Sequence, residues 1–186
     1  KNLNNANSRS AQVIYHEAGH AVVSEILNPG SVTIVSLLGG RNGVGGLTVC
    51  SDLNSEDADP FFLKIQRIIS GLGGMAGVEC KFGITNCGSS EDLDIVFREV
   101  YKLISDDCVW GLSNYAFGFD DSEHKKHQLE VISSAQVEKY YHKAKEIITQ
   151  NKELFEAIAH ALAEKVTITK IDIQKIKKRL AGQTAA

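Results

Sequence analysis

Apolar residues recur with helical spacing along most of this chain. The first such segment runs from Ser10 to Leu27 and ends at Asn28-Pro29-Gly30, where proline and glycine interrupt the pattern. Its apolar positions cover a wide face, which predicts a largely buried helix. Further helices are predicted from Pro60 onward, over Ser90–Cys108, over Val131–Gln150, over Glu153–Glu164 and after Thr169.

Two short segments near the N-terminus have the composition of strands instead. Val32–Leu38 is rich in β-branched residues, and Val44–Val49 follows it after a glycine-rich turn at Gly39–Gly43. These patterns predict a mainly α fold of the α+β class, with a small N-terminal β-sheet and a C-terminal helical bundle from about residue 129. Residues 1–10 are polar and rich in asparagine, so we expect a disordered lead-in there and one domain over residues 11–186.

Two interruptions of the helical pattern also carry information. Gly71, Gly73, Gly74 and Gly77 lie in the far half of the helix that starts at Pro60. They predict either a tight contact between helices or a break near Gly73. The stretch from Trp110 to His127 is polar and loop-like, and it predicts a connection between helices.

Composition and charge then limit the classes of function. The chain is 43% hydrophobic and 23% charged, with a net charge of −3, which is typical of a soluble globular protein. The acidic balance argues against nucleic-acid binding, which usually needs a basic surface. No run reaches the roughly 18 apolar residues of a membrane span, so no membrane segment is expected. The four cysteines form no C-x-x-C pair, which argues against thiolate zinc ligands and favours thiols in a reducing compartment.

One motif points to chemistry. Tyr15-His16-Glu17-Ala18-Gly19-His20 contains H-E-x-x-H within the first predicted helix. Residues i and i+4 share a helix face, so His16 and His20 can both reach one metal ion at about 2.0–2.1 Å. Glu17 lies one position round from His16 and can act as a general base toward water on that ion without binding the ion. The alternative is a helix with two hydrogen-bonded histidines and a glutamate, which the apolar flanks of the motif disfavour.

Two histidines leave such a site one ligand short, because a catalytic zinc usually has three protein ligands and one open position. The extended motif H-E-x-x-H-x-x-G-x-x-H is absent from the chain. Spacing therefore leaves the identity of the third ligand open. Asp92 also has a structural interpretation, because an acid in the first turn of a helix interacts favourably with the helix dipole. The candidates are His124, His127, His142 and His160 among the histidines, and Glu79, Glu91, Asp92, Asp94 and Glu99 among the carboxylates.

Five segments extend the comparison beyond this motif. They are YHEAGHAVV, VTIVSLLGG followed by VGGLT, ISGLGGMAGVECKFG, NCGSSEDLDIVFREVYKLI and AKEIITQNKELFEAIAHALAEKVTI. In this order they resemble the peptidase domain of FtsH-type ATP-dependent zinc metalloproteases. The resemblance covers nearly the whole chain from Val13 onward, which makes it more specific than H-E-x-x-H alone.

The resemblance implies a complete site. Asp92 matches the aspartate of the family's G-A-S-N-D motif and would be the third ligand of one Zn²⁺ per chain, beside His16 and His20. Glu79 matches the second glutamate of the family's A-A-E-E and would orient a ligating histidine. The edge strand expected to pair with an extended substrate corresponds to Gly45, Gly46 and Leu47.

The activity that the resemblance implies is zinc-dependent endopeptidase cleavage of unfolded or extended polypeptides, with Glu17 as the general base. The alternative is a non-catalytic, zinc-stabilised interaction domain derived from such a protease. No G-x-x-x-x-G-K-[ST] motif occurs, so no ATP site is expected in this chain, and Met75 and Val78 replace an arginine and a glutamate of the family pattern. Because the family forms hexamers, the resemblance implies that this chain assembles with copies of itself, as a homo-oligomer, or with an ATPase module. It also implies a location in the cytoplasm or in the equivalent organelle compartment, which is the matrix or the stroma.

Overall fold

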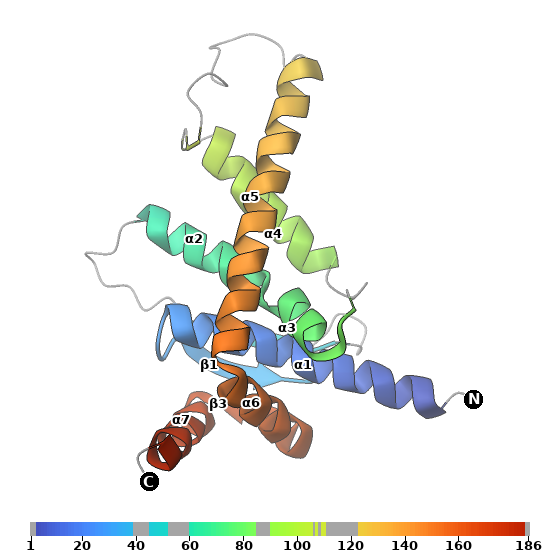
Figure 1. Cartoon of the computed structure of the whole chain (residues 1–186), viewed down its shortest axis with the longest axis vertical. Coiled ribbons are helices and arrows are strands. Elements are labelled where there is room, and N and C mark those ends of the chain that lie inside the picture. Colours follow the sequence, from blue (N-terminus) through green and yellow to red (C-terminus); the bar gives the residue numbers. More distant parts are fainter. Residues whose placement is uncertain are drawn as a thin grey trace.

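Helices make up most of this computed structural model of the 186-residue chain (Figure 1). It describes residues 3–38, 45–51, 60–84, 90–105, 107, 109–110 and 123–184, without the side chains of residues 3–10, 124–125 and 183–184. The mainly α class with a small sheet is confirmed. The described elements are α1 (Leu3–Leu27), β1 (Val32–Ser36), β2 (Leu47–Cys50), α2 (Pro60–Gly71), α3 (Gly73–Phe82), α4 (Ser90–Ser105), α5 (Glu123–Gln150), α6 (Lys152–Lys165), β3 (Thr167–Thr169) and α7 (Lys170–Thr184).

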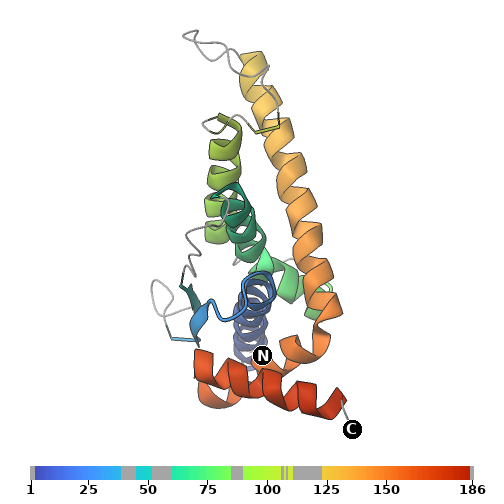
Figure 2. The same cartoon turned by 90° about the vertical axis from the view of Figure 1, so that its left-hand side faces the viewer.

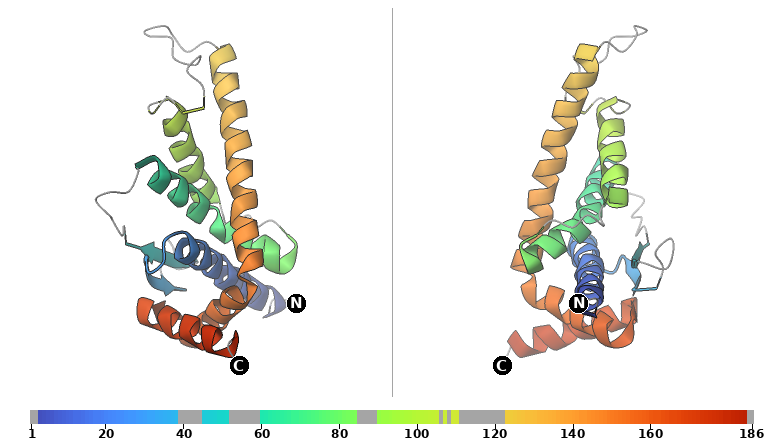
Figure 3. Two further views of the ribbon diagram at one scale, coloured as in Figure 1. Left: turned by 60° about the vertical axis from the view of Figure 1, so that its left-hand side comes forward. Right: turned by 90° about the vertical axis from the view of Figure 1, so that its right-hand side faces the viewer.

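Helix α1 forms the centre of the molecule. The helices α2, α3 and α4 lie on one side of it and α6 and α7 on the other (Figures 1 and 3). Its residues from Ala18 to Val23 are all buried, and the apolar ones have no exposed surface. They belong to one cluster of buried apolar side chains that reaches from α1 to Ile176 in α7. The prediction of a largely buried helix is therefore confirmed.

The start of α1 differs from the expectation. The helix begins at Leu3 rather than at Ser10, so the expected disordered lead-in over residues 1–10 is corrected for residues 3–10. This segment contains no glycine or proline that would stop a helix. Its asparagines and serines cost only a few tenths of a kcal/mol each relative to better helix formers, so the helix that follows can extend through them.

A three-stranded sheet lies beside α1, in the order β2-β1-β3. The central strand β1 is antiparallel to both neighbours, so one edge of β2 has no strand beside it in the described part of the chain. The predicted strand pair is confirmed, although β1 ends at Ser36 and β2 begins only at Leu47. Gly45 has a φ of 138°, which a strand residue with a side chain rarely adopts.

The third strand was not predicted. Only three residues long, β3 lies directly between two helices, so no run of alternating positions announces it. Its Ile168 is fully buried and pairs with Val35 of β1. The strand forms because the C-terminal part of the chain returns to the N-terminal sheet.

The glycine-rich segment produces the break that was predicted near Gly73. Helix α2 ends at Gly71 and α3 begins at Gly73, with only Leu72 between them. Helix α4 ends at Ser105, before the predicted end at Cys108. The predicted turn at Gly39–Gly43 lies outside the described residues.

Helix α5 begins earlier than the sequence indicated. It starts at Glu123, so residues 123–127 are helical rather than part of the predicted loop, and residues 111–122 lie outside the description. A glutamate in the first turn favours a helix start because it opposes the positive end of the helix dipole. The helix then runs along one side of the molecule to meet α6 (Figure 2). Every helix in the described ranges is too short or too polar to cross a lipid bilayer.

Helices α1 and α3 cross at a contact made of glycines. A Cβ atom on Gly19 would lie 2.1 Å from the carbonyl oxygen of Gly73, and one on Gly77 would lie 2.5 Å from the carbonyl oxygen of Tyr15. Both distances are far below a van der Waals contact, so only glycine allows the two backbones to approach this closely. The tight helix contact that the glycine cluster predicted therefore exists, and it lies on the helix that carries H-E-x-x-H.

We expect Gly19→Ala to lower the free energy of unfolding by about 3 kcal/mol, because the added methyl group must push α1 away from α3. Urea denaturation followed by circular dichroism measures the change. Gly182→Ala in α7 is the matched control, since a Cβ there would have no described atom within 4 Å apart from its chain neighbours and the nearby backbone of its own helix. Alanine at that exposed helical position should change stability by no more than about 1 kcal/mol, in the stabilising direction. Equal loss in both variants would contradict the crossing.

Candidate metal centre

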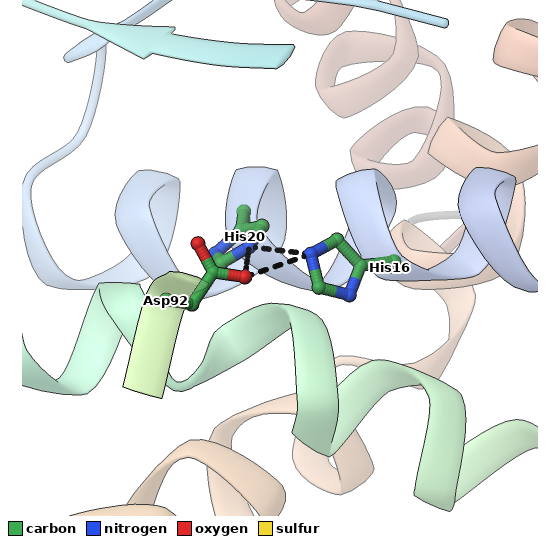
Figure 4. A group of neighbouring side chains, drawn as sticks. All are labelled: His16, His20 and Asp92. Atoms are coloured by element: carbon green, nitrogen blue, oxygen red, sulfur yellow. Dashed lines mark hydrogen bonds and ion pairs between the residues drawn. The ribbon is translucent and has the colours of Figure 1, made fainter. Parts of the chain in front are cut away.

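The two histidines of the motif face each other on one side of α1. Their Nε2 atoms are 3.0 Å apart, and the ring of His20 is buried, with 8% of the residue exposed. This is the arrangement expected of positions i and i+4 on a helix. Figure 4 shows that both rings point toward the carboxylate of Asp92, which comes from the start of α4.

A hydrogen bond at Nδ1, the ring nitrogen that faces away from Asp92, fixes the orientation of His20. Its Nδ1 lies 2.8 Å from the carbonyl oxygen of Ser70, near the end of α2, where helix carbonyls lack a partner within their own helix. A carbonyl oxygen only accepts, so Nδ1 must carry the proton. In the neutral ring, Nε2 then keeps its lone pair and points it at His16 and Asp92, as a metal ligand requires. Nδ1 of His16 is buried without a hydrogen-bond partner among the described atoms.

Asp92 completes the group. Its Oδ2 lies 3.0 Å from Nε2 of His16 and 3.4 Å from Nε2 of His20. Four ligands at 2.0–2.1 Å in a tetrahedron are separated from one another by about 3.3 Å, so these three atoms already have the spacing of a zinc site. Three electron-pair donors this close repel one another unless a proton or a cation lies between them. The donor set and its geometry therefore fit a small divalent cation.

The charge state of the group supports the same conclusion. Burial alone would raise the pKa of Asp92, but hydrogen bonds from His16 and His20 and their charge hold it well below its usual range. Burial alone would lower the pKa of His20, yet its hydrogen bond to Asp92 and the charges of Asp92 and Glu17 leave it above the usual value. The ionised carboxylate thus favours positive charge at the histidine rings, which a proton on Nε2 supplies in one state and a metal ion bound to the neutral rings supplies in the other.

Glu17 lies next to this group without belonging to it. The glutamate is 4% exposed, and the described side chains that could share one ion are His16, His20 and Asp92 alone. The hydroxyl of Thr48 in β2 donates to Oε2 of Glu17 over 2.7 Å. A buried carboxylate beside a metal-binding group, with one oxygen engaged, is the arrangement of a general base.

The profile of peptidase family M41 matches residues 4–176 of the chain. The chain belongs to this family. It is 29% identical over 170 residues to the ATP-dependent zinc metalloprotease FtsH 2 of Thermoanaerobacter sp. (strain X514), a match that covers 87% of this chain and 31% of the relative. It is 27% identical over 170 residues to FtsH 3 of Phytoplasma mali (strain AT), with 88% and 27% covered. The resemblance to an FtsH-type peptidase domain is confirmed, and the chain spans less than a third of the length of these relatives.

The other candidate ligands lie elsewhere in the M41 domain. His127, His142 and His160 are exposed, and each lies near a glutamate of its own helix. The side chain of His124 is outside the described part. Glu91, Asp94 and Glu99 lie on α4 but do not join the metal-binding group. None of the alternatives whose side chains are described therefore shares a metal-binding group with the histidine pair.

Glu79 has partners other than those that the resemblance implied. Its carboxylate accepts a hydrogen bond from the Tyr141 hydroxyl and one from Nζ of Lys145 at 2.5 Å, both on α5. The Lys145 and Tyr141 hydrogen bonds lower the pKa of Glu79. The atom that accepts from His20 is instead the Ser70 carbonyl oxygen. In this structure Glu79 ties α3 to α5 and has no direct bond to either histidine of the site.

Of the three residues expected to bind substrate, Gly46 lies against Glu17. Gly45 takes its positive φ just before β2, and Leu47 begins that strand with 47% of its surface exposed. Between them, Gly46 contacts Glu17 so closely that a Cβ would lie 2.2 Å from Cγ of the glutamate. Binding of a substrate by this strand stays a prediction, but the strand lies beside the catalytic candidate.

Gly74 is a site residue that the sequence reasoning did not single out. A Cβ on Gly74 would lie 2.4 Å from Cε1 of His16 and 2.4 Å from Nε2 of His20. The rings can therefore occupy their positions only because α3 has no side chain there. The sequence did contain a signal for this residue, because Gly74 belongs to the L-G-G of the segment that resembles the family. The glycine cluster was interpreted only as a helix contact or a helix break.

Replacement of Asp92 by alanine should weaken Zn²⁺ binding by at least about 100-fold, because two histidines cannot hold the ion as three ligands do. Competition with a chromophoric chelator measures the affinity. Asp94→Ala is the matched control, since Asp94 is exposed on the same helix two positions on. Equal affinities of the Asp92 and Asp94 variants would exclude Asp92 as a ligand.

Gly74→Ala should weaken Zn²⁺ binding by about tenfold or more, because the new methyl group displaces both ligating rings. The same chelator competition applies, together with a thermal melt to show that the domain remains folded. Gly182→Ala, which adds the same methyl group in open space, should bind Zn²⁺ like the wild type. An unchanged affinity in Gly74→Ala would mean that α3 does not limit the position of the histidines.

Proposed function

We propose that this M41 domain is a zinc endopeptidase that cleaves unfolded or extended polypeptides, with Glu17 as its general base. The observation that carries the proposal is the placement of a buried glutamate beside a three-ligand group with tetrahedral spacing. The name zinc metalloprotease, borne by the relatives, supports Zn²⁺ as the ion. The single ligand group among the described residues supports one ion per chain.

His16, His20 and Asp92 would hold the ion. Zinc in such a site supplies Lewis-acid chemistry, because it lowers the pKa of water toward about 7 and polarises the scissile carbonyl. The remaining work falls to Glu17, which takes the proton of the attacking water and delivers it to the leaving amine. The carboxylate is suited to both steps because Thr48 engages Oε2 and leaves the other oxygen for the proton.

Strand β2 is the proposed substrate-binding edge. An extended peptide can add to an unpaired strand edge through backbone hydrogen bonds, whatever its side chains are. The edge of β2 that has no neighbouring strand among the described residues begins at Leu47, directly after Gly46, which contacts Glu17. Since only an extended backbone can pair in this way, the proposal favours unfolded segments over folded proteins as substrates.

Delivery of such segments belongs to the same proposal. The relatives are called ATP-dependent, and the 186 residues contain no G-x-x-x-x-G-K-[ST] motif. We therefore propose that an ATPase module, in a longer protein or a hexameric assembly, unfolds and supplies the polypeptide. A cytoplasmic, matrix or stromal location agrees with this role.

Glu17→Gln should lower the rate of casein cleavage by about 10²–10⁴-fold, because the amide cannot accept the proton. Its Zn²⁺ content should stay equal to that of the wild type, since Glu17 is not a ligand. Fluorescent casein fragments and elemental analysis provide the two measurements. Glu138→Gln, at an exposed position on α5, is the control for loss of one negative charge.

Two outcomes would contradict the proposal. Cleavage at the wild-type rate by Glu17→Gln would remove the proposed base from the mechanism. Full zinc occupancy without any cleavage, in the presence of denatured substrate, would favour the zinc-stabilised interaction domain.

A further inference from the structure

Thr48 connects the edge strand to the buried glutamate. Its hydroxyl lies 2.7 Å from Oε2 of Glu17 and 3.3 Å from the backbone oxygen of the same residue. A threonine hydroxyl has one proton to donate, and a carboxylate oxygen is the stronger acceptor. The shorter contact is therefore the hydrogen bond, and it is directed at the carboxylate.

The sheet holds Thr48 in this orientation. Side chains alternate between the two faces of a strand, and the neighbours Leu47 and Val49 are 47% and 40% exposed. Thr48 thus points toward α1 while its neighbours point away. The residue pairs with Val35 of the central strand, so a β-ladder rather than a loop sets the position of the hydroxyl.

Gly46 limits the carboxylate from the other side. A Cβ at that position would lie 2.5 Å from Cδ and 2.6 Å from Oε1 of Glu17. The backbone of Gly46 therefore packs against the glutamate, while Thr48 binds Oε2. Two residues of the same strand segment confine the side chain, and Oε1 is the oxygen that Thr48 leaves unbound.

We propose that Thr48 is a positioning residue for Glu17. Its hydrogen bond couples the orientation of the general base to strand β2. The inference rests on the proposed function, since the glutamate must act as a base for its orientation to matter. Without the hydroxyl, the buried carboxylate loses a hydrogen bond and can rotate away from the attacking water. Turnover should then fall while substrate binding along the strand edge stays intact.

Thr48→Val and Thr48→Ser test this inference in the zinc-loaded chain. Valine keeps the β-branched shape that fits a strand but removes the hydroxyl, whereas serine keeps the hydroxyl. Cleavage of a fluorogenic peptide gives kcat and KM. Affinity for a peptide hydroxamate, measured by calorimetry, gives a second readout, because the hydroxamate releases a proton that the neighbouring base accepts on binding.

Thr48→Val should lower kcat by about 10- to 100-fold, which corresponds to loss of one hydrogen bond to a charged group, with KM changed by less than about twofold. Its Zn²⁺ content should equal that of the wild type, a thermal melt should show a folded domain, and it should bind the hydroxamate about tenfold more weakly. Thr48→Ser should restore kcat and hydroxamate affinity to within about threefold of the wild type.

The inference is overturned if Thr48→Val turns over like the wild type, or if serine fails to rescue it. Loss of Zn²⁺ or failure to fold in the valine variant would also overturn it, since the hydroxyl would then be structural. An inactive wild type would refute the proposed function separately. The affinity for the hydroxamate would then decide the inference. Weaker binding by Thr48→Val but not by Thr48→Ser would support it. Equal affinities of all three proteins, or no binding by the wild type, would overturn it.

Discussion

Helices α1 and α3 approach each other so closely that two glycines touch backbone to backbone, and the rest of the site depends on this contact. Gly19 packs against the carbonyl group of Gly73, which brings the start of α3 directly under the histidine rings. The absence of a side chain at Gly74 leaves room for those rings. A larger residue at any of these positions would separate the helices and, with them, the groups that form the site.

The break between α2 and α3 serves the same site in a second way. Because α2 ends at Gly71, the Ser70 carbonyl oxygen lies near a helix end and can accept from Nδ1 of His20. That bond fixes the tautomer, and the tautomer leaves Nε2 for a metal ion. One interruption in a helical pattern thus both orients a ligand and supplies the backbone that packs against it.

Helix α1 carries two buried glutamates, one paired with a lysine and the other with a neutral hydroxyl. Glu25 is 3% exposed and forms an ion pair with Lys177 at 2.8 Å, which neutralises its charge and ties α7 to α1. Glu17 is similarly buried but is held by the neutral hydroxyl of Thr48, beside a group suited to a cation. The ion pair of Glu25 joins two helices, whereas the proposed role of general base belongs to Glu17. Burial alone therefore does not separate the two roles.

Local patterns in the sequence determined much of this structure. Periodicity gave the buried helix α1, composition gave the β1–β2 pair, and the glycine cluster gave the break near Gly73, because each depends on residues close together in the chain. The same patterns missed β3 and the helical residues at 3–10 and 123–127, where packing or helix extension overrides weak local preference.

The residues of the candidate site also fall into those that local sequence patterns predicted and those that the tertiary structure decided. His16, Glu17 and His20 could be found from the sequence because helix geometry alone places positions i and i+4 on one face. Spacing left Asp92 as one of several candidates, and only the resemblance to a known family selected it. The contacts of Thr48, Gly74 and Ser70 with the motif, and the bonds of Glu79 to α5, were decided by the tertiary structure alone, because each joins elements whose approach no local pattern encodes.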